Sequence, residues 1–112
     1  MSLPGIPIED IDTPALVIDL DLLESNIARM ADFFSDKKAN LRPHTKTHKT
    51  PILAHKQIEA GAQGVTCAKL GEAEVMAAAG IRDIGFKGNG ALAEFTVPQE
   101  ALDYALQRSG LS

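Results

Sequence analysis

The amino-acid sequence predicts an α/β fold in which parallel strands alternate with helices. Short apolar segments alternate with amphipathic ones about three and a half times, a rhythm typical of strand–helix units joined by right-handed crossovers. Glycines stand directly after two of the predicted helices. Hydrophobic residues make up 45% of the 112 positions, which is enough for one core. The alternation fits either a doubly wound sheet or part of a closed (β/α) barrel.

The first predicted unit follows an irregular lead-in, residues 1–13. Pro14–Asp19 is a short, apolar and β-branched run, typical of a strand buried on both faces. A helix is predicted from Asp21 to Ser35, because Asp21 and Glu24 have the spacing of a capping box. Its apolar residues recur at intervals of four, three and four and predict one buried stripe, Leu23, Ile27, Met30 and Phe34.

The second unit begins with Leu41–Lys46, which predicts another strand. Thr50 supplies an N-cap and Pro51 a first-position proline for a helix that ends near Ala60. Gly61 then suits the left-handed residue that commonly closes a helix. The order of these signals predicts a strand, a loop and a second helix.

The third unit combines a strand at Gly64–Ala68 with an alanine-rich helix at Leu70–Ala79, closed by Gly80 in the same way. Ile81–Phe86 predicts a fourth strand. We therefore assign residues 14–86 to one α/β domain.

Residues 87–112 differ in character and are predicted to form a divergent tail. Lys87–Gly90 predicts a turn or loop, since two of its four residues are glycine. Pro98–Arg108 predicts one further helix.

Composition excludes several classes of protein. The chain has 11 basic and 15 acidic residues, a formal charge of −4, which disfavours nucleic acid and anionic membranes as partners. A single cysteine, Cys67, cannot form an intrachain disulfide, so a small secreted scaffold is excluded. No apolar run approaches the ~18 residues of a membrane span, and Met1–Asp12 lacks the pattern of a signal peptide. We expect a soluble, cytoplasmic protein.

The charge is unevenly distributed along the chain. Residues 1–36 hold eight acids and one base, whereas residues 37–56 hold six bases, all three histidines and no acid. Such a basic cluster in an acidic chain indicates a local anionic ligand. A solvated basic stretch is the alternative that composition leaves open.

The basic cluster includes the predicted strand Leu41–Lys46. Alternation along a strand places Arg42, His44 and Lys46 on one face. Lys46 then lies at the carboxyl end, where the active sites of parallel α/β folds collect. Neighbouring positive charges favour its neutral amine, which suits Schiff-base chemistry with an aldehyde. The surrounding cations are candidates to hold an anionic cofactor or a substrate carboxylate.

The other candidate residues are expected to have structural roles rather than functional ones. His44 and His48 have a spacing that aligns zinc ligands on a helix, but here it straddles a strand end, so we expect no metal site. Cys67 lies in an apolar strand and is expected to be a buried small side chain. The glycines form no nucleotide-binding fingerprint.

Four blocks of sequence resemble, in order and spacing, the D-threonine aldolase and D-serine dehydratase family. These are pyridoxal-phosphate enzymes of fold type III, and their barrel is related to the N-terminal domain of alanine racemase. The resemblance covers about residues 11–84, and its most specific part is the string Arg-Pro-His-Thr-Lys-Thr-His-Lys. The four blocks are Asp12–Asp21, Asn26–Met30, Leu41–Lys49 and Gly71–Glu74.

The resemblance implies a partial TIM-type (β/α) barrel, of about its first three to four units, as an N-terminal fragment, truncated or frame-shifted, of a longer protein. It implies that Lys46 bears pyridoxal 5'-phosphate, beside Arg42 and His44. The implied activity is a lyase, an aldolase or a dehydratase, acting on D-β-hydroxy amino acids such as D-threonine or D-serine. A non-catalytic cofactor-binding protein is the alternative. The full-length family further implies a homodimer and a divalent metal whose ligands lie outside this chain.

Overall fold

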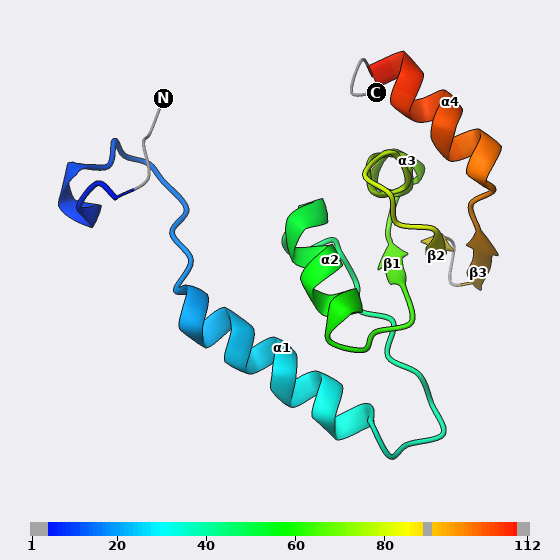
Figure 1. Cartoon of the computed structure of the whole chain (residues 1–112), viewed down its shortest axis with the longest axis horizontal. Coiled ribbons are helices and arrows are strands. Elements are labelled where there is room, and N and C mark those ends of the chain that lie inside the picture. Colours follow the sequence, from blue (N-terminus) through cyan, green and yellow to red (C-terminus); the bar gives the residue numbers. More distant parts are fainter. Residues whose placement is uncertain (1–4, 89–90, 110–112) are drawn as a thin grey trace.

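The computed structural model describes residues 5–88 and 91–109 of the chain. This part comprises a short 3-10 helix, four α-helices and three strands (Figure 1). In chain order they are η1 (Ile8–Asp10), α1 (Leu20–Phe34), α2 (Pro51–Glu59), β1 (Val65–Cys67), α3 (Leu70–Ala78), β2 (Asp83–Gly88), β3 (Ala91–Thr96) and α4 (Gln99–Ser109).

The strands form one sheet in the order β1–β2–β3. β1 and β2 run parallel, with Val65 opposite Ile84 and Cys67 opposite Phe86. α3 connects these two strands and packs against both of them. The predicted parallel strand–helix–strand unit is therefore confirmed.

The predicted strand at Leu41–Lys46 is reduced to a single parallel bridge between His44 and Thr66. The Thr66 N–H donates to the Pro43 carbonyl at 2.8 Å, and the Thr45 N–H donates to the Thr66 carbonyl at 2.9 Å. The extended segment ends early because the chain turns at Thr45, whose carbonyl accepts the Lys49 N–H at 2.8 Å. This segment nevertheless adds a fourth extended chain beside β1.

The prediction of a strand at Pro14–Asp19 is wrong. The segment has no regular structure, and its apolar side chains are exposed, Leu16 fully so. A strand needs a neighbour to pair with its backbone, and none lies beside this segment in the part of the chain that is described. The helix cap also differs from the prediction, because the carboxylate of Asp19, two residues before Asp21, accepts the Leu22 N–H at 3.1 Å.

The predicted tail takes part in the sheet. β2 extends to Gly88 and pairs antiparallel with β3, with Asp83 opposite Thr96. β3 was not predicted, because two alanines and a glutamate, which are poor strand formers, make up half of its residues. The turn predicted at Lys87–Gly90 falls partly on residues 89–90, outside the described part of the chain. The tail helix is confirmed as α4, and the domain boundary at residue 86, which falls inside β2, stays a prediction.

The buried core lies where the sheet meets α2 and α3. Its fully buried side chains include Val65 and Cys67 of β1, Met76 of α3 and Ile84 of β2. α1 contributes no buried residue, although Leu23, Ile27 and Phe34 of its predicted stripe are half-buried. Met30, the remaining member of that stripe, is exposed.

Glycines end two helices as predicted. Gly61 follows α2 with a φ of +130°, and Gly80 follows α3 with a φ of +97°. Side chains rarely adopt this backbone conformation, which explains the choice of glycine at both positions.

α1 lies along α2 and away from the sheet (Figure 1). Lys56 of α2 and Glu24 of α1 form an ion pair at 3.1 Å. In residues 5–88 and 91–109, no helix has both the length and the apolar character that a membrane crossing requires.

Candidate functional site

Lys46 lies just beyond the carboxyl end of the extended segment that pairs with β1. Its side chain is exposed, and its amine has no ion-pair or hydrogen-bond partner among the described residues. Its backbone N–H donates to Nδ1 of His44 at 3.1 Å. The geometry therefore presents a free primary amine at the edge where parallel α/β folds place their active sites.

A tight turn from Thr45 to Lys49 holds this lysine in place. The Lys49 N–H closes the turn on the Thr45 carbonyl, and Lys49 has a φ of +56°, in the left-handed region. Thr45 anchors the turn in the core, because its fully buried hydroxyl donates to the Thr66 carbonyl at 3.3 Å. Lys46 thus lies inside a closed turn, directly after a buried residue.

His44 is half-buried and lies next to Lys46. Burial lowers the pKa of its imidazole, and the positive charges of Lys46 and Lys87 lower that pKa further, while the carboxylate of Glu72 raises it. Because Nδ1 accepts the Lys46 N–H, the neutral ring carries its proton on Nε2. The site therefore offers a neutral imidazole beside the free amine.

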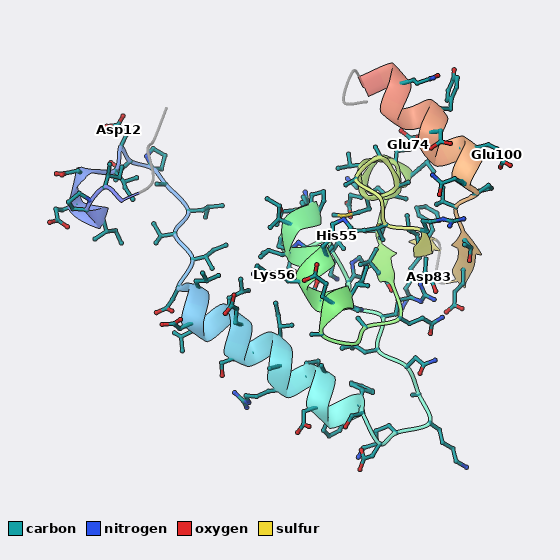
Figure 2. All side chains as sticks on the ribbon, in the orientation of Figure 1. Asp12, His55, Lys56, Glu74, Asp83 and Glu100 are labelled. Carbon is teal, nitrogen blue, oxygen red and sulfur yellow. The ribbon has the colours of Figure 1, made fainter. Side chains whose placement is uncertain are left out.

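Arg42 lies at the opposite end of the same segment and is almost completely buried, with 9% of its side chain exposed. Its guanidinium forms ion pairs with Asp83 at 2.6 Å and with Glu94 at 3.4 Å. Asp83 stands at the start of β2 (Figure 2), so Arg42 bridges the first residues of the parallel strands. The structure brings His44 and Lys46 together, whereas it pairs Arg42 with two carboxylates.

Glu72 was not among the predicted site residues. It lies in the first turn of α3, where its carboxylate accepts the Ala68 N–H at 3.3 Å. Its negative charge acts on His44, while Glu74, two residues further along α3, is exposed. The sequence contained no signal for the contact of Glu72 with the end of β1.

The remaining histidines have structural partners. The Nδ1 atom of His48 accepts the Thr50 N–H at 3.0 Å, and its Nε2 lies 3.2 Å from Oε1 of Gln57. His55, on the side of α2 that faces α3 (Figure 2), donates from Nε2 to the Ala79 carbonyl at 2.8 Å. Within the described ranges, no group of three or more His, Cys, Asp or Glu side chains is placed to hold a metal ion.

Cys67 is fully buried in β1, as predicted for a small core side chain. Burial raises the pKa of its thiol, and the opposing effect of the hydrogen bond to Thr45 is smaller. The thiolate is the nucleophilic form, so this cysteine is poorly suited to catalysis.

Parallel extended segments, with a lysine amine beyond their carboxyl end that is free among the described residues, define a lysine-bearing α/β site. The family model "Alanine racemase, N-terminal domain" matches residues 18–111, and the chain belongs to this family. The predicted partial TIM-type barrel is thereby confirmed. The matched range also includes the residues predicted as a tail.

Curated relatives confirm the resemblance seen in the sequence. A D-threonine aldolase from Arthrobacter sp. is 44% identical over 81 residues, which are 72% of this chain and 21% of that protein. A D-threo-3-hydroxyaspartate dehydratase from Delftia sp. strain HT23 is 50% identical over 74 residues, 66% of this chain and 20% of that protein. The chain thus spans about a fifth of the length of these relatives.

A solved structure agrees with the family assignment. The crystal structure of D-threonine aldolase from Filomicrobium marinum superposes with a TM-score of 0.69 at 54% identity. The superposition covers 71% of this chain and 22% of that one. The two proteins therefore share the fold of the part of the aldolase that this chain covers.

Proposed function

We propose that this chain carries the cofactor-bearing strand end of a pyridoxal-phosphate-dependent lyase that acts on D-β-hydroxy amino acids, with Lys46 as the attachment residue. The observation that carries the proposal is the free, exposed amine of Lys46 just beyond a parallel bridge. The names of the relatives, an aldolase and a dehydratase, support lyase chemistry on small D-amino acids such as D-threonine or D-serine.

The residues at this edge fit an aldehyde cofactor that bears anionic groups. The Lys46 amine is exposed and unpaired in the described part of the chain, so an aldehyde has access to it. Lys87 adds positive charge beside His44, which favours a phosphate ester. When bound, pyridoxal phosphate supplies an electron sink for cleavage at the substrate carbon next to the amine.

The residues around Lys46 have distinct tasks in this proposal. His44 accepts the Lys46 backbone N–H through Nδ1 and thereby orients the turn, while its Nε2–H remains available to a ligand. Glu72 balances the positive charge of the site from α3. A contact between Arg42 and the cofactor stays a prediction, since both of its ion pairs lie at the other end of the segment.

Titration of the purified chain with pyridoxal phosphate tests the proposal. Wild type and Lys49→Ala should develop the visible absorption of protein-bound cofactor, whereas Lys46→Ala should not. Lys49 is a matched control because it is an exposed lysine in the same turn. Equal absorption in Lys46→Ala would exclude Lys46 as the attachment residue.

A lyase assay tests the catalytic part of the proposal. Conversion of D-threonine or D-serine in the presence of a divalent metal would support the lyase over a non-catalytic pyridoxal-phosphate-binding protein. Cofactor binding without turnover is expected of either candidate, because this chain spans about a fifth of the length of its relatives. A homodimeric state and a cytoplasmic location, both implied by the sequence, stay predictions.

A further inference from the structure

The side chain of His48 connects the loop that follows Lys46 to α2. The side chain is half-buried, and both of its ring nitrogens have partners. Nδ1 accepts the Thr50 N–H at 3.0 Å, and because a backbone N–H can only donate, the neutral ring carries its proton on Nε2. The Nε2–H then donates to Oε1 of Gln57 at 3.2 Å. One imidazole thus makes a hydrogen bond at each nitrogen, which fixes the orientation of the ring.

Both partners of His48 belong to a helix that the core holds in place. Thr50 is the N-cap of α2, and Gln57 lies about two turns further along the same helix. α2 contributes Leu53 and Ala54 to the set of buried residues. The imidazole therefore ties the loop to two points of an element whose position is set by buried side chains.

The residue after His48 has a backbone conformation that needs support. Lys49 has a φ of +56°, in the left-handed region that residues with a side chain rarely adopt. Such a conformation persists where the surrounding contacts determine it. The Lys49 N–H bonds to the Thr45 carbonyl at 2.8 Å, and the two bonds of His48 hold the adjacent backbone against α2. The turn that contains Lys46 is thus fixed at Thr45 and at His48.

The shape of this turn decides between two lysines with the same chemistry. Lys46 and Lys49 both lie in the turn, and both are exposed. An aldehyde distinguishes them by where the turn places each amine. A group that is already held in the required position reacts without first having to be ordered. The contacts that fix the turn therefore determine which of the two amines takes up an aldehyde.

We propose that His48 is a positioning residue for Lys46. Its two hydrogen bonds to α2 hold the turn so that the Lys46 amine, and not the Lys49 amine, lies at the carboxyl end of the extended segment. His48 acts through the backbone of the turn, since both of its ring nitrogens bond to α2 or its N-cap. The inference rests on the proposed function, in which the Lys46 amine takes up pyridoxal phosphate.

Reductive fixation of pyridoxal phosphate in variants of the full chain tests the proposal. The ratio of labelled Lys46 to labelled Lys49, measured by peptide mapping, should fall about tenfold in His48→Ala, which loses both hydrogen bonds. His48→Asn should restore most of the ratio, because its amide oxygen can replace Nδ1 as the acceptor. His55→Ala is the matched control, since it loses a histidine hydrogen bond between α2 and the end of α3. An unchanged ratio in His48→Ala, or an equal fall in His55→Ala, would overturn the proposal.

Amide hydrogen exchange of the chain without cofactor provides a second test. In His48→Ala, the Lys49 N–H that closes the turn should exchange about tenfold faster than in the wild type. The Thr45 N–H, which bonds to β1, should keep its protection. Gln57→Ala removes only the partner of Nε2 and should have a smaller effect in the same direction.

The two measurements separate this inference from the proposed function. Undiminished protection of the Lys49 N–H in both His48→Ala and Gln57→Ala would overturn the positioning role, even if Lys46 carries the cofactor. A wild-type chain in which Lys46 stays unlabelled would instead refute the proposed function, whatever the exchange of the Lys49 N–H shows.

Discussion

The two halves of this chain contrast in what their apolar residues contact. From Leu53 to Val97, apolar side chains of two helices and a sheet form a buried core. From residue 5 to residue 40, no side chain in the described structure is fully buried. Both halves have clear helix and strand patterns in the sequence, so pattern alone does not produce burial.

The contrast shows what a secondary-structure signal needs to become tertiary structure. Asp19 caps α1, and an exposed ion pair links α1 to α2. The apolar stripe of α1 is only half-buried, and the segment Pro14–Asp19 before it joins no sheet in the described part of the chain. An amphipathic helix gains most of its stability from the surface that it covers.

Truncation of one apolar side chain in each half should give the largest difference. Ile84→Ala removes a fully buried side chain of β2 and should lower the free energy of unfolding by about 2–5 kcal/mol. Leu22→Ala removes an exposed side chain of α1 and should change it by less than ~0.5 kcal/mol. Urea denaturation followed by circular dichroism measures both. Equal losses would mean that α1 is as well packed as the sheet.

A pair of glycine substitutions sharpens the comparison within the half that contains the buried core. A Cβ on Gly64 would collide with the backbone carbonyl of Asp83, so Gly64→Ala should cost about 1–3 kcal/mol. A Cβ on Gly71 meets nothing, so Gly71→Ala in α3 should be neutral or stabilise the chain by about 0.5–1 kcal/mol. A neutral Gly64→Ala would show that β1 and β2 are not packed this closely.

The sequence predicted the elements of the half with the buried core better than those of the other half, for a physical reason. Gly61 and Gly80 are local signals that act on the residues beside them, and both end helices as expected. The strand expected at Pro14–Asp19 depended on a distant partner, which local composition does not reveal. β3 was missed for the converse reason, because pairing with β2 stabilises a segment of low intrinsic strand propensity.

The residues of the candidate site also differ in whether local sequence could predict their contacts. Lys46 was predicted as the cofactor residue from its place at a strand end and from the motif around it, both of which are local. The ion pairs of Arg42 with Asp83 and Glu94 join residues far apart in the sequence and were not predicted. The contact of Glu72 with Ala68 depends on where α3 begins, so only the three-dimensional structure could reveal it.

Replacement of Arg42 tests whether ion pairs between residues far apart in the sequence stabilise the half with the buried core. Arg42→Gln should cost about 1–3 kcal/mol, because it leaves the partly buried carboxylate of Asp83 without its cationic partner. Lys37→Gln breaks an exposed ion pair with Asp36 and should cost less than ~0.5 kcal/mol. Loss of cofactor binding in a still folded Arg42→Gln variant would support the predicted contact of Arg42 with the cofactor.

The smallest expected effect on stability comes from the protonation of His44, which NMR can monitor. Its pKa should lie below the usual value of about 6.5, so the folded state binds fewer protons than the unfolded state. His44 should therefore reduce stability as the pH falls below about 6.5 and have no such effect above it. Glu72→Gln should lower the pKa further, and Glu74→Gln should leave it unchanged. Equal shifts in both variants would contradict the position of Glu72.

The most direct test of the account is reductive fixation of pyridoxal phosphate with borohydride, in the folded chain and in urea. The chain has seven lysines, and only the fold distinguishes Lys46 from exposed neighbours such as Lys49. Peptide mapping should place most of the cofactor on Lys46 in the folded chain and spread it over all lysines in urea. An even distribution in the folded chain, or labelling mainly at Lys49, would contradict the assignment of Lys46 as the cofactor residue.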